Sequence, residues 1–130
     1  MYPKETIILC EDENLIALDI RHQLKRLGYN VLKICSTGED LIKSAKELKP
    51  DIIITDIQLR GKITGIEAMK IIRKEIPVPF VFLSGQQNPA TFYEAMKTNP
   101  NDFVSKPFSI EQLSRALLNC RQGAAVNNAL

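Results

Sequence analysis

Residues 52–56, Ile52-Ile53-Ile54-Thr55-Asp56, form a short apolar run that ends in a carboxylate. Such a run is typical of a strand that is buried on both faces, as in a parallel α/β sheet. Ligands bind sheets of this kind outside the carboxyl ends of the strands. We therefore expect Asp56 to lie at a ligand-binding edge.

Three other segments place polar residues at the end of an apolar, strand-like run. These runs are residues 7–10, 80–83 and 103–105, and they are followed by Glu11-Asp12, Ser84-Gly85 and Lys106-Pro107. The carboxyl ends of parallel strands meet at one edge of the sheet. Segments that lie far apart in the sequence are therefore predicted to meet in one pocket.

The residue types of this pocket favour phosphoryl chemistry on a carboxylate. Glu11, Asp12 and Asp56 would repel one another, and Mg²⁺ held by oxygen ligands is a common way to neutralise such a group. The Lys106 ammonium and the Ser84 hydroxyl are suited to binding phosphate oxygens. Asp56 stands alone at its strand end, so it is the best candidate for a nucleophile that forms an aspartyl phosphate.

The chain resembles the response-regulator receiver domain of two-component signalling over about residues 6–121. Each matching segment alone would be weak evidence, whereas the ordered set is highly specific. The segments are Ile7-Ile8-Leu9-Cys10-Glu11-Asp12-Glu13, Asp51-Ile52-Ile53-Ile54-Thr55-Asp56-Ile57, Gly65-Ile66-Glu67, Phe82-Leu83-Ser84-Gly85 and Phe103-Val104-Ser105-Lys106-Pro107-Phe108.

The resemblance implies an α/β fold of the flavodoxin-like, doubly wound (βα)5 type, whose five-stranded parallel sheet has the order 2-1-3-4-5. We expect a receiver domain over residues 1–121, with a C-terminal tail or truncated linker at 122–130. Apolar residues at helical spacing predict a helix after each strand. The helices are residues 16–27, ended by Gly28; 41–48, ended by Pro50; 66–76, ended by Pro77; a short one opened by Asn88-Pro89; and one capped by Ser109 and Gln112.

The function that the resemblance implies is phosphotransfer to Asp56 from the phosphohistidine of a sensor histidine kinase or a histidine phosphotransfer protein. Mg²⁺ would be held by Asp12, Asp56 and the backbone carbonyl of Gln58, with Glu11 contributing directly or through water. No enzymatic activity is expected beyond self-phosphorylation from donors and autodephosphorylation.

The same resemblance implies a switch. Ser84 and Lys106 would engage the phosphoryl oxygens, and the rotamer of Phe103 would follow the state of the site. The face formed by the fourth helix, the last strand and the fifth helix would then bind an output partner or a second copy of the chain. Outward positions on this face include Glu111, Arg115 and Leu118.

Composition agrees with a single small signalling domain. The formal net charge of +2 comes without a basic run, so direct binding of nucleic acid by this segment is not expected. No stretch approaches the roughly 20 apolar residues that a membrane helix needs, and we expect a cytoplasmic location. Cys10, Cys35 and Cys120 are widely spaced and odd in number, which indicates reduced, buried thiols.

Two alternatives remain open from the sequence. A haloacid-dehalogenase-like, Mg²⁺-dependent phosphatase uses the same residue types, although their order along the chain differs from that family's pattern. A pseudo-receiver would serve only as a phosphorylation-independent interaction module. The chain also departs from the receiver pattern in the loop at residues 58–64, which is longer than the shortest family version, and in residues 98–102 before the last strand. The second departure, together with a fourth helix that looks short, leads us to expect an unusual output face.

Overall fold

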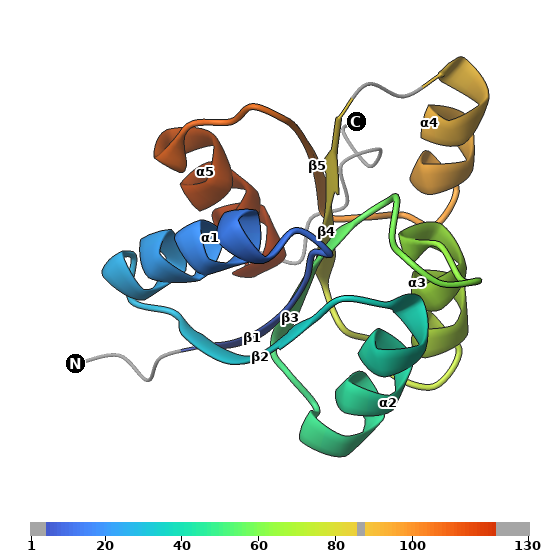
Figure 1. The fold of residues 1–130 in the computed structure, drawn as a ribbon, viewed down its shortest axis with the longest axis horizontal. Helices are drawn as coiled ribbons and strands as arrows, with labels where there is room; N and C mark the ends of the chain where they lie inside the picture. Colours follow the sequence, from blue (N-terminus) through green and yellow to red (C-terminus); the bar gives the residue numbers. More distant parts are fainter. Residues whose placement is uncertain (1–4, 86–87, 122–130) are drawn as a thin grey trace.

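One parallel sheet lies between two layers of helices in the computed structural model, which describes residues 5–85 and 88–121 (Figure 1). The strand order is β2-β1-β3-β4-β5, which confirms the doubly wound, flavodoxin-like prediction. The expected tail at 122–130 lies outside the described residues. The strands are β1 (Thr6–Cys10), β2 (Asn30–Cys35), β3 (Ile52–Asp56), β4 (Phe80–Ser84) and β5 (Asp102–Ser105).

The helices divide between the two faces of the sheet. In Figure 1, α1 and α5 lie on one side, and α2, α3 and α4 lie on the other. The helices are α1 (Asn14–Arg26), α2 (Gly38–Leu48), α3 (Gly65–Arg73), α4 (Pro89–Met96) and α5 (Ile110–Arg121). Each of the first four helices connects one strand to the next parallel strand, so the carboxyl ends of all five strands lie at one edge of the sheet.

Alternation along the strands supplies two separate cores. In β1, Ile7 and Leu9 pack with residues of α1 and α5, whereas Ile8 and Cys10 pack with residues of α2 and α3. Every residue of β3 and β4 is buried. This confirms that their apolar runs are strands covered on both faces, and it explains why they show no polar alternation.

The predicted helix boundaries are largely confirmed. The helix α1 ends just before Gly28, which has a φ of +97° that glycine adopts without strain. The Asn88 side chain caps α4, and Pro89 occupies its first turn. Ser109 and Gln112 exchange hydrogen bonds of 2.8 and 3.2 Å at the start of α5, as a capping box requires.

The predicted third helix was too long. It was expected to reach Ile76, but α3 ends at Arg73 with Lys74 as its C-cap. Pro77 disfavours helical backbone in the residue that precedes it, so the chain leaves the helix within the last turn. Ile76 still packs against the core on the α2–α3 side, which accounts for its apolar character.

The three cysteines are free and buried, as predicted. Burial raises the pKa of Cys35 to about 11 and that of Cys120 to about 12, and it raises the pKa of Cys10 as well. The thiols therefore stay protonated at neutral pH and are poor nucleophiles. Within residues 5–85 and 88–121, none of the helices has the length and apolar character needed to cross a membrane.

Candidate functional site

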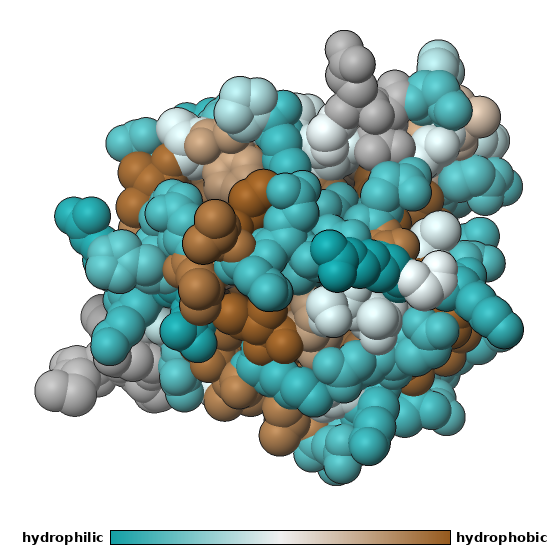
Figure 2. Space-filling model, in the orientation of Figure 1, coloured by the Kyte–Doolittle hydropathy of each residue, from teal (hydrophilic) through white to brown (hydrophobic). Residues whose placement is uncertain are grey.

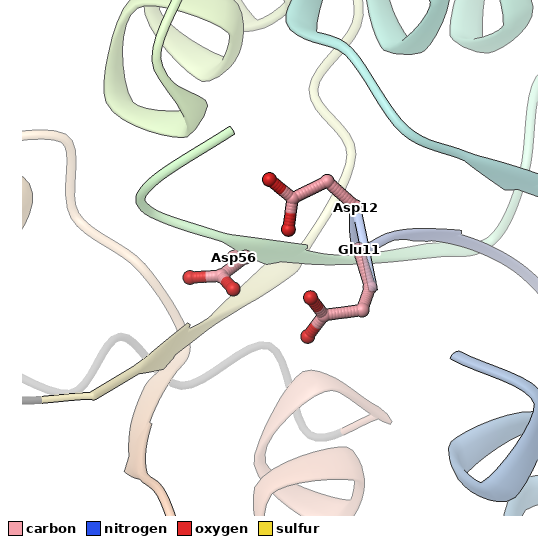
Figure 3. A group of neighbouring side chains, drawn as sticks. All are labelled: Glu11, Asp12 and Asp56. Carbon is pink, nitrogen blue, oxygen red and sulfur yellow. The ribbon is translucent and has the colours of Figure 1, made fainter. Parts of the chain in front are cut away.

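Three carboxylates converge at the carboxyl edge of the sheet. Glu11 and Asp12 follow β1, and Asp56 ends β3, the strand paired with it (Figure 3). One carboxylate oxygen from each residue lies within 4.8 Å of the others. The segments that follow β1 and end β3 therefore meet as predicted, because the parallel register of the two strands places their ends side by side.

Lys106 joins this group from the end of β5. Its Nζ donates hydrogen bonds of 2.7 Å to Glu11 Oε1 and 2.7 Å to Asp56 Oδ2. Glu11 is 1% exposed and Asp56 is 7% exposed, so both acids are buried around one ammonium. The peptide bond between Lys106 and Pro107 is cis. We refer to Glu11, Asp56 and Lys106 as the pocket floor.

Burial and pairing oppose one another in the pocket floor. Burial raises the pKa of Glu11, because the ionised form loses hydration, and the hydrogen bond from Lys106 offsets only part of this effect. For Lys106, burial acts to lower the pKa, but hydrogen bonds to Asp56 and Glu11 and their charges outweigh it, so the pKa is raised. Lys106 therefore stays a cation at neutral pH.

The backbone after β3 holds the Asp56 carboxylate in place. Asp56 Oδ1 accepts a 3.3 Å hydrogen bond from the Gln58 N–H, while Oδ2 accepts from Lys106. The Gly65 N–H donates to the Ile57 carbonyl at 2.8 Å, and a Cβ at Gly65 would collide with the Asp56 carbonyl oxygen. A glycine is required at position 65 because the start of α3 passes directly against the end of β3.

Ser84 and Phe103 lie on the next strands of the same sheet. The Ser84 side chain is buried at the end of β4, and its hydroxyl donates to the Gly85 carbonyl at 3.0 Å. The ring of Phe103 is half-buried and packs edge-to-face against Phe92, with centroids 4.9 Å apart. A groove of about 620 Å³ joins the two; it is lined by Ser84, Gly85, Pro89, Phe92, Met96, Phe103 and Ser105.

The third carboxylate has a different cation. Arg60 Nε lies 3.9 Å from Asp12 Oδ2, and the Arg60 side chain is 74% exposed. We refer to Asp12 and Arg60 as the pocket rim. An ion pair this open to water is strongly screened, unlike the contacts of the pocket floor.

The family of the chain follows from comparison with known proteins. The family model described as "Response regulator receiver domain" matches residues 7–118. The chain belongs to the response-regulator receiver domain family. Receiver domains are signalling domains rather than classical enzymes, and a domain of this family implies interaction with a histidine kinase or phosphotransfer partner. Membership favours the receiver over the haloacid-dehalogenase alternative.

Curated relatives are similar to this chain over part of their own length. The "Sensory transduction protein BceR" of Halalkalibacterium halodurans is 35% identical over 107 residues, which cover 82% of this chain and 46% of the relative. The "Alkaline phosphatase synthesis transcriptional regulatory protein PhoP" of Bacillus subtilis is 29% identical over 128 residues, which cover 95% of this chain and 52% of the relative. The chain thus spans about half the length of these relatives.

Solved receiver domains share the whole fold. The signal receiver domain of a modulated diguanylate cyclase from Desulfovibrio desulfuricans G20 has a TM-score of 0.87 and 30% identity, covering 93% of this chain and 96% of that one. A response regulator receiver domain protein from Clostridium thermocellum has a TM-score of 0.84 and 25% identity, covering 92% and 95%. The sheet order and the helix layers are therefore those of known receiver domains.

Sequence reasoning anticipated part of this site. Glu11, Asp12, Asp56 and Lys106 meet as predicted, while their roles and the metal-binding role of the Gln58 carbonyl stay predictions. Ser84 is buried beside them at the same edge of the sheet, with its hydroxyl on a backbone carbonyl. The packing role of Gly65 and the position of Arg60 were missed. The available signal for Arg60 was the loop at residues 58–64, which is longer than the shortest family version.

Proposed function

We propose that this domain accepts a phosphoryl group on Asp56 from a phosphohistidine of a sensor kinase or a histidine phosphotransfer protein. An Asp56 carboxylate oxygen forms the new bond to phosphorus while the bond from phosphorus to the donor imidazole nitrogen breaks, and the imidazole keeps that electron pair. The observation that carries the proposal is the 2.7 Å contact of Lys106 Nζ with Asp56 Oδ2, beside two further carboxylates.

The acidic group fits Mg²⁺ by its donor set. Hard carboxylate oxygens are the ligands that Mg²⁺ prefers, and ligands at about 2.1 Å from the ion lie up to about 4.2 Å apart. The three carboxylates offer oxygens within 4.8 Å of one another, so small side-chain movements would complete such a site. We assign Asp12, Asp56 and the Gln58 carbonyl as ligands, with Glu11 contributing directly or through water. Bound Mg²⁺ would supply positive charge to the phosphoryl oxygens.

The other pocket residues act on the new phosphoryl group. Lys106 is already held at Asp56 Oδ2, so its ammonium neutralises a phosphoryl oxygen without a long movement. The Ser84 hydroxyl turns from the Gly85 carbonyl to a second oxygen. Phe103 then repacks in the groove that it shares with Ser84, as a population shift between two packings.

A partner surface lies next to this groove. Phe92 and Tyr93 of α4 are exposed, and Leu118 of α5 is 46% exposed. Figure 2 shows further apolar side chains among hydrophilic ones over the region of α1 and α5, on the side of the sheet away from α4. We propose that phosphorylation changes the α4–β5–α5 face, which binds an output partner or a second copy of the chain.

Chemical phosphorylation tests the phosphoacceptor. Incubation with acetyl phosphate and Mg²⁺ should add one phosphoryl group, seen by intact-mass spectrometry as an acid-labile adduct. Asp56→Asn should show no stable adduct, and full labelling of that variant would refute the assignment. The absence of any adduct on the parent protein supports the pseudo-receiver, whereas turnover of a small phosphate ester supports a phosphatase.

Metal titration tests the ligand set. Asp12→Ala should lose Mg²⁺ binding, because the remaining acids are held by Lys106 and offer fewer free oxygens. Calorimetry that leaves Asp12→Ala indistinguishable from the parent contradicts the proposed ligands.

Hydrogen exchange tests the output face. Addition of beryllofluoride, a phosphoryl mimic, should change protection in residues 92–121 as well as in the pocket loops. Changes confined to the loops that bear Asp56 and Ser84 would rule out this route and favour a partner that reads the pocket loops directly.

A further inference from the structure

The loop between β3 and α3 packs against the start of α2. Arg60 forms an isolated parallel bridge with Thr37, the residue that caps α2. A Cβ at Gly38 would lie only 2.8 Å from the Ile63 side chain and backbone, so a larger residue there would push the loop away. The backbone of Arg60 is therefore fixed by packing rather than left to solvent.

A second glycine adapts the loop to this packing. Gly61 has a φ of +93°, a backbone conformation that residues other than glycine rarely adopt. A Cβ at this position would lie 3.2 Å from a Glu39 carboxylate oxygen. The bend at Gly61 follows Arg60 directly and lies against Glu39 of α2.

The packing of this loop places the Arg60 cation beside Asp12, the carboxylate that Lys106 does not contact. Lys106 is shared by Glu11 and Asp56, whereas Asp12 has Arg60, with Nε 3.9 Å from Oδ2. Lys62 lies two residues further along the same loop, is exposed, and takes part in none of the ion pairs of the described residues. Both residues are cations of the same loop, so the position of Arg60 on the packed loop, rather than its charge alone, places it beside Asp12.

We infer that Arg60 is the counter-ion of the metal-free rim and competes with the divalent cation for Asp12. The inference rests on the proposed function, because it requires Mg²⁺ to use Asp12. A carboxylate oxygen that faces a guanidinium must give up that attraction when the metal binds, and the two cations also repel one another. Arg60 therefore lowers Mg²⁺ affinity and raises the metal concentration at which the site fills.

The size of the effect follows from exposure. Arg60 is 74% exposed, so water and salt screen its attraction to Asp12. Exposed ion pairs are worth less than one power of ten in an equilibrium constant, which corresponds to about a two- to fivefold change in Mg²⁺ affinity.

The test is Mg²⁺ titration of Arg60→Gln, followed by the amide NMR signals of the pocket loops in the metal-free full chain. Lys62→Gln is the matched control, because it removes the same charge from the same loop. We expect the dissociation constant for Mg²⁺ to fall about two- to fivefold in Arg60→Gln and to stay near the parent value in Lys62→Gln. The gap should narrow as ionic strength rises.

Each outcome decides the matter. Equal or weaker Mg²⁺ binding by Arg60→Gln overturns the inference, and so does an equal gain in Lys62→Gln, which would reveal a general charge effect. Far-ultraviolet circular dichroism checks that both variants are folded. If the parent protein binds no Mg²⁺, so that its titration is identical to that of Asp12→Ala, the proposed function fails instead. The failure of the inference can therefore be told apart from the failure of the proposed function.

Discussion

The pocket floor and the pocket rim pair acids with bases in opposite surroundings. In the floor, Lys106 contacts Glu11 and Asp56 at 2.7 Å, and both acids are buried. In the rim, Arg60 and Asp12 lie 3.9 Å apart, and Arg60 is largely in solvent. The same kind of charge pair therefore has a structural role in one place and a tuning role in the other.

This contrast in burial predicts how each charge pair responds to mutation. Removing one partner from a buried pair leaves an uncompensated charge in a poorly solvated place, whereas an exposed charge regains its hydration. The floor should therefore respond to mutation through stability. The rim should respond through metal affinity and salt dependence.

The largest effect should come from breaking the floor from beneath. Gly65→Ala places a methyl group against the Asp56 carbonyl, so β3 or α3 must shift, and we expect a loss of about 3 kcal/mol or more of unfolding free energy. Urea unfolding measures it. Gly85→Ala is the control, since nothing lies within 4 Å of a Cβ at that position. Similar stability of the two variants would contradict the close packing at Gly65.

Removing the ammonium of the floor should have the next largest effect. Lys106→Met leaves Glu11 and Asp56 facing each other without a cation, and we expect a loss of about 2–4 kcal/mol at neutral pH in the metal-free protein. Denaturant unfolding provides the measurement. A loss below about 0.5 kcal/mol would mean that the floor behaves like an exposed pair.

Glu11, one of the two acids of the floor, should also affect how the free energy of unfolding depends on pH. Burial raises the pKa of Glu11 above its ordinary 4.5, so the folded protein holds this proton more tightly than the unfolded chain. The stability that this group contributes is full below 4.5 and is lost as pH rises through the raised pKa. We expect Glu11→Gln, which has no such proton to lose, to gain stability relative to the parent over that interval.

The measurement is the difference in unfolding free energy between Glu11→Gln and the parent as a function of pH, without metal. Taking the difference cancels the contributions of other titrating groups that the two proteins share. A difference that does not change with pH contradicts the raised pKa.

The smallest effect on stability should come from the rim. Arg60→Gln removes only a screened contact, and we expect the unfolding free energy of the metal-free protein to change by less than about 0.5 kcal/mol. Unfolding curves collected beside those of Lys106→Met give the comparison directly. A loss of equal size in both variants would erase the distinction between floor and rim.

Much of this architecture was readable from pattern alone. The apolar runs of β3 and β4 identified interior strands, and Asn88-Pro89 and Ser109 identified helix starts, because these signals are local. The end of α3 was missed by several residues, because apolar spacing continued past Arg73 into chain that packs on the core without being helical. Local pattern reports burial more surely than it reports where a helix ends.

Local pattern was enough to predict the parallel α/β class and the polar residues at the strand ends, because apolar runs and the residues that follow them are encoded within a few positions. The pairing of each cation with its acid depends instead on how the chain folds. Lys106 reaches the floor because β5 pairs with β4, which in turn pairs with β3, and Arg60 reaches Asp12 because its loop packs against the start of α2. Such pairings depend on distances between segments remote in sequence, which close packing sets and no local pattern records.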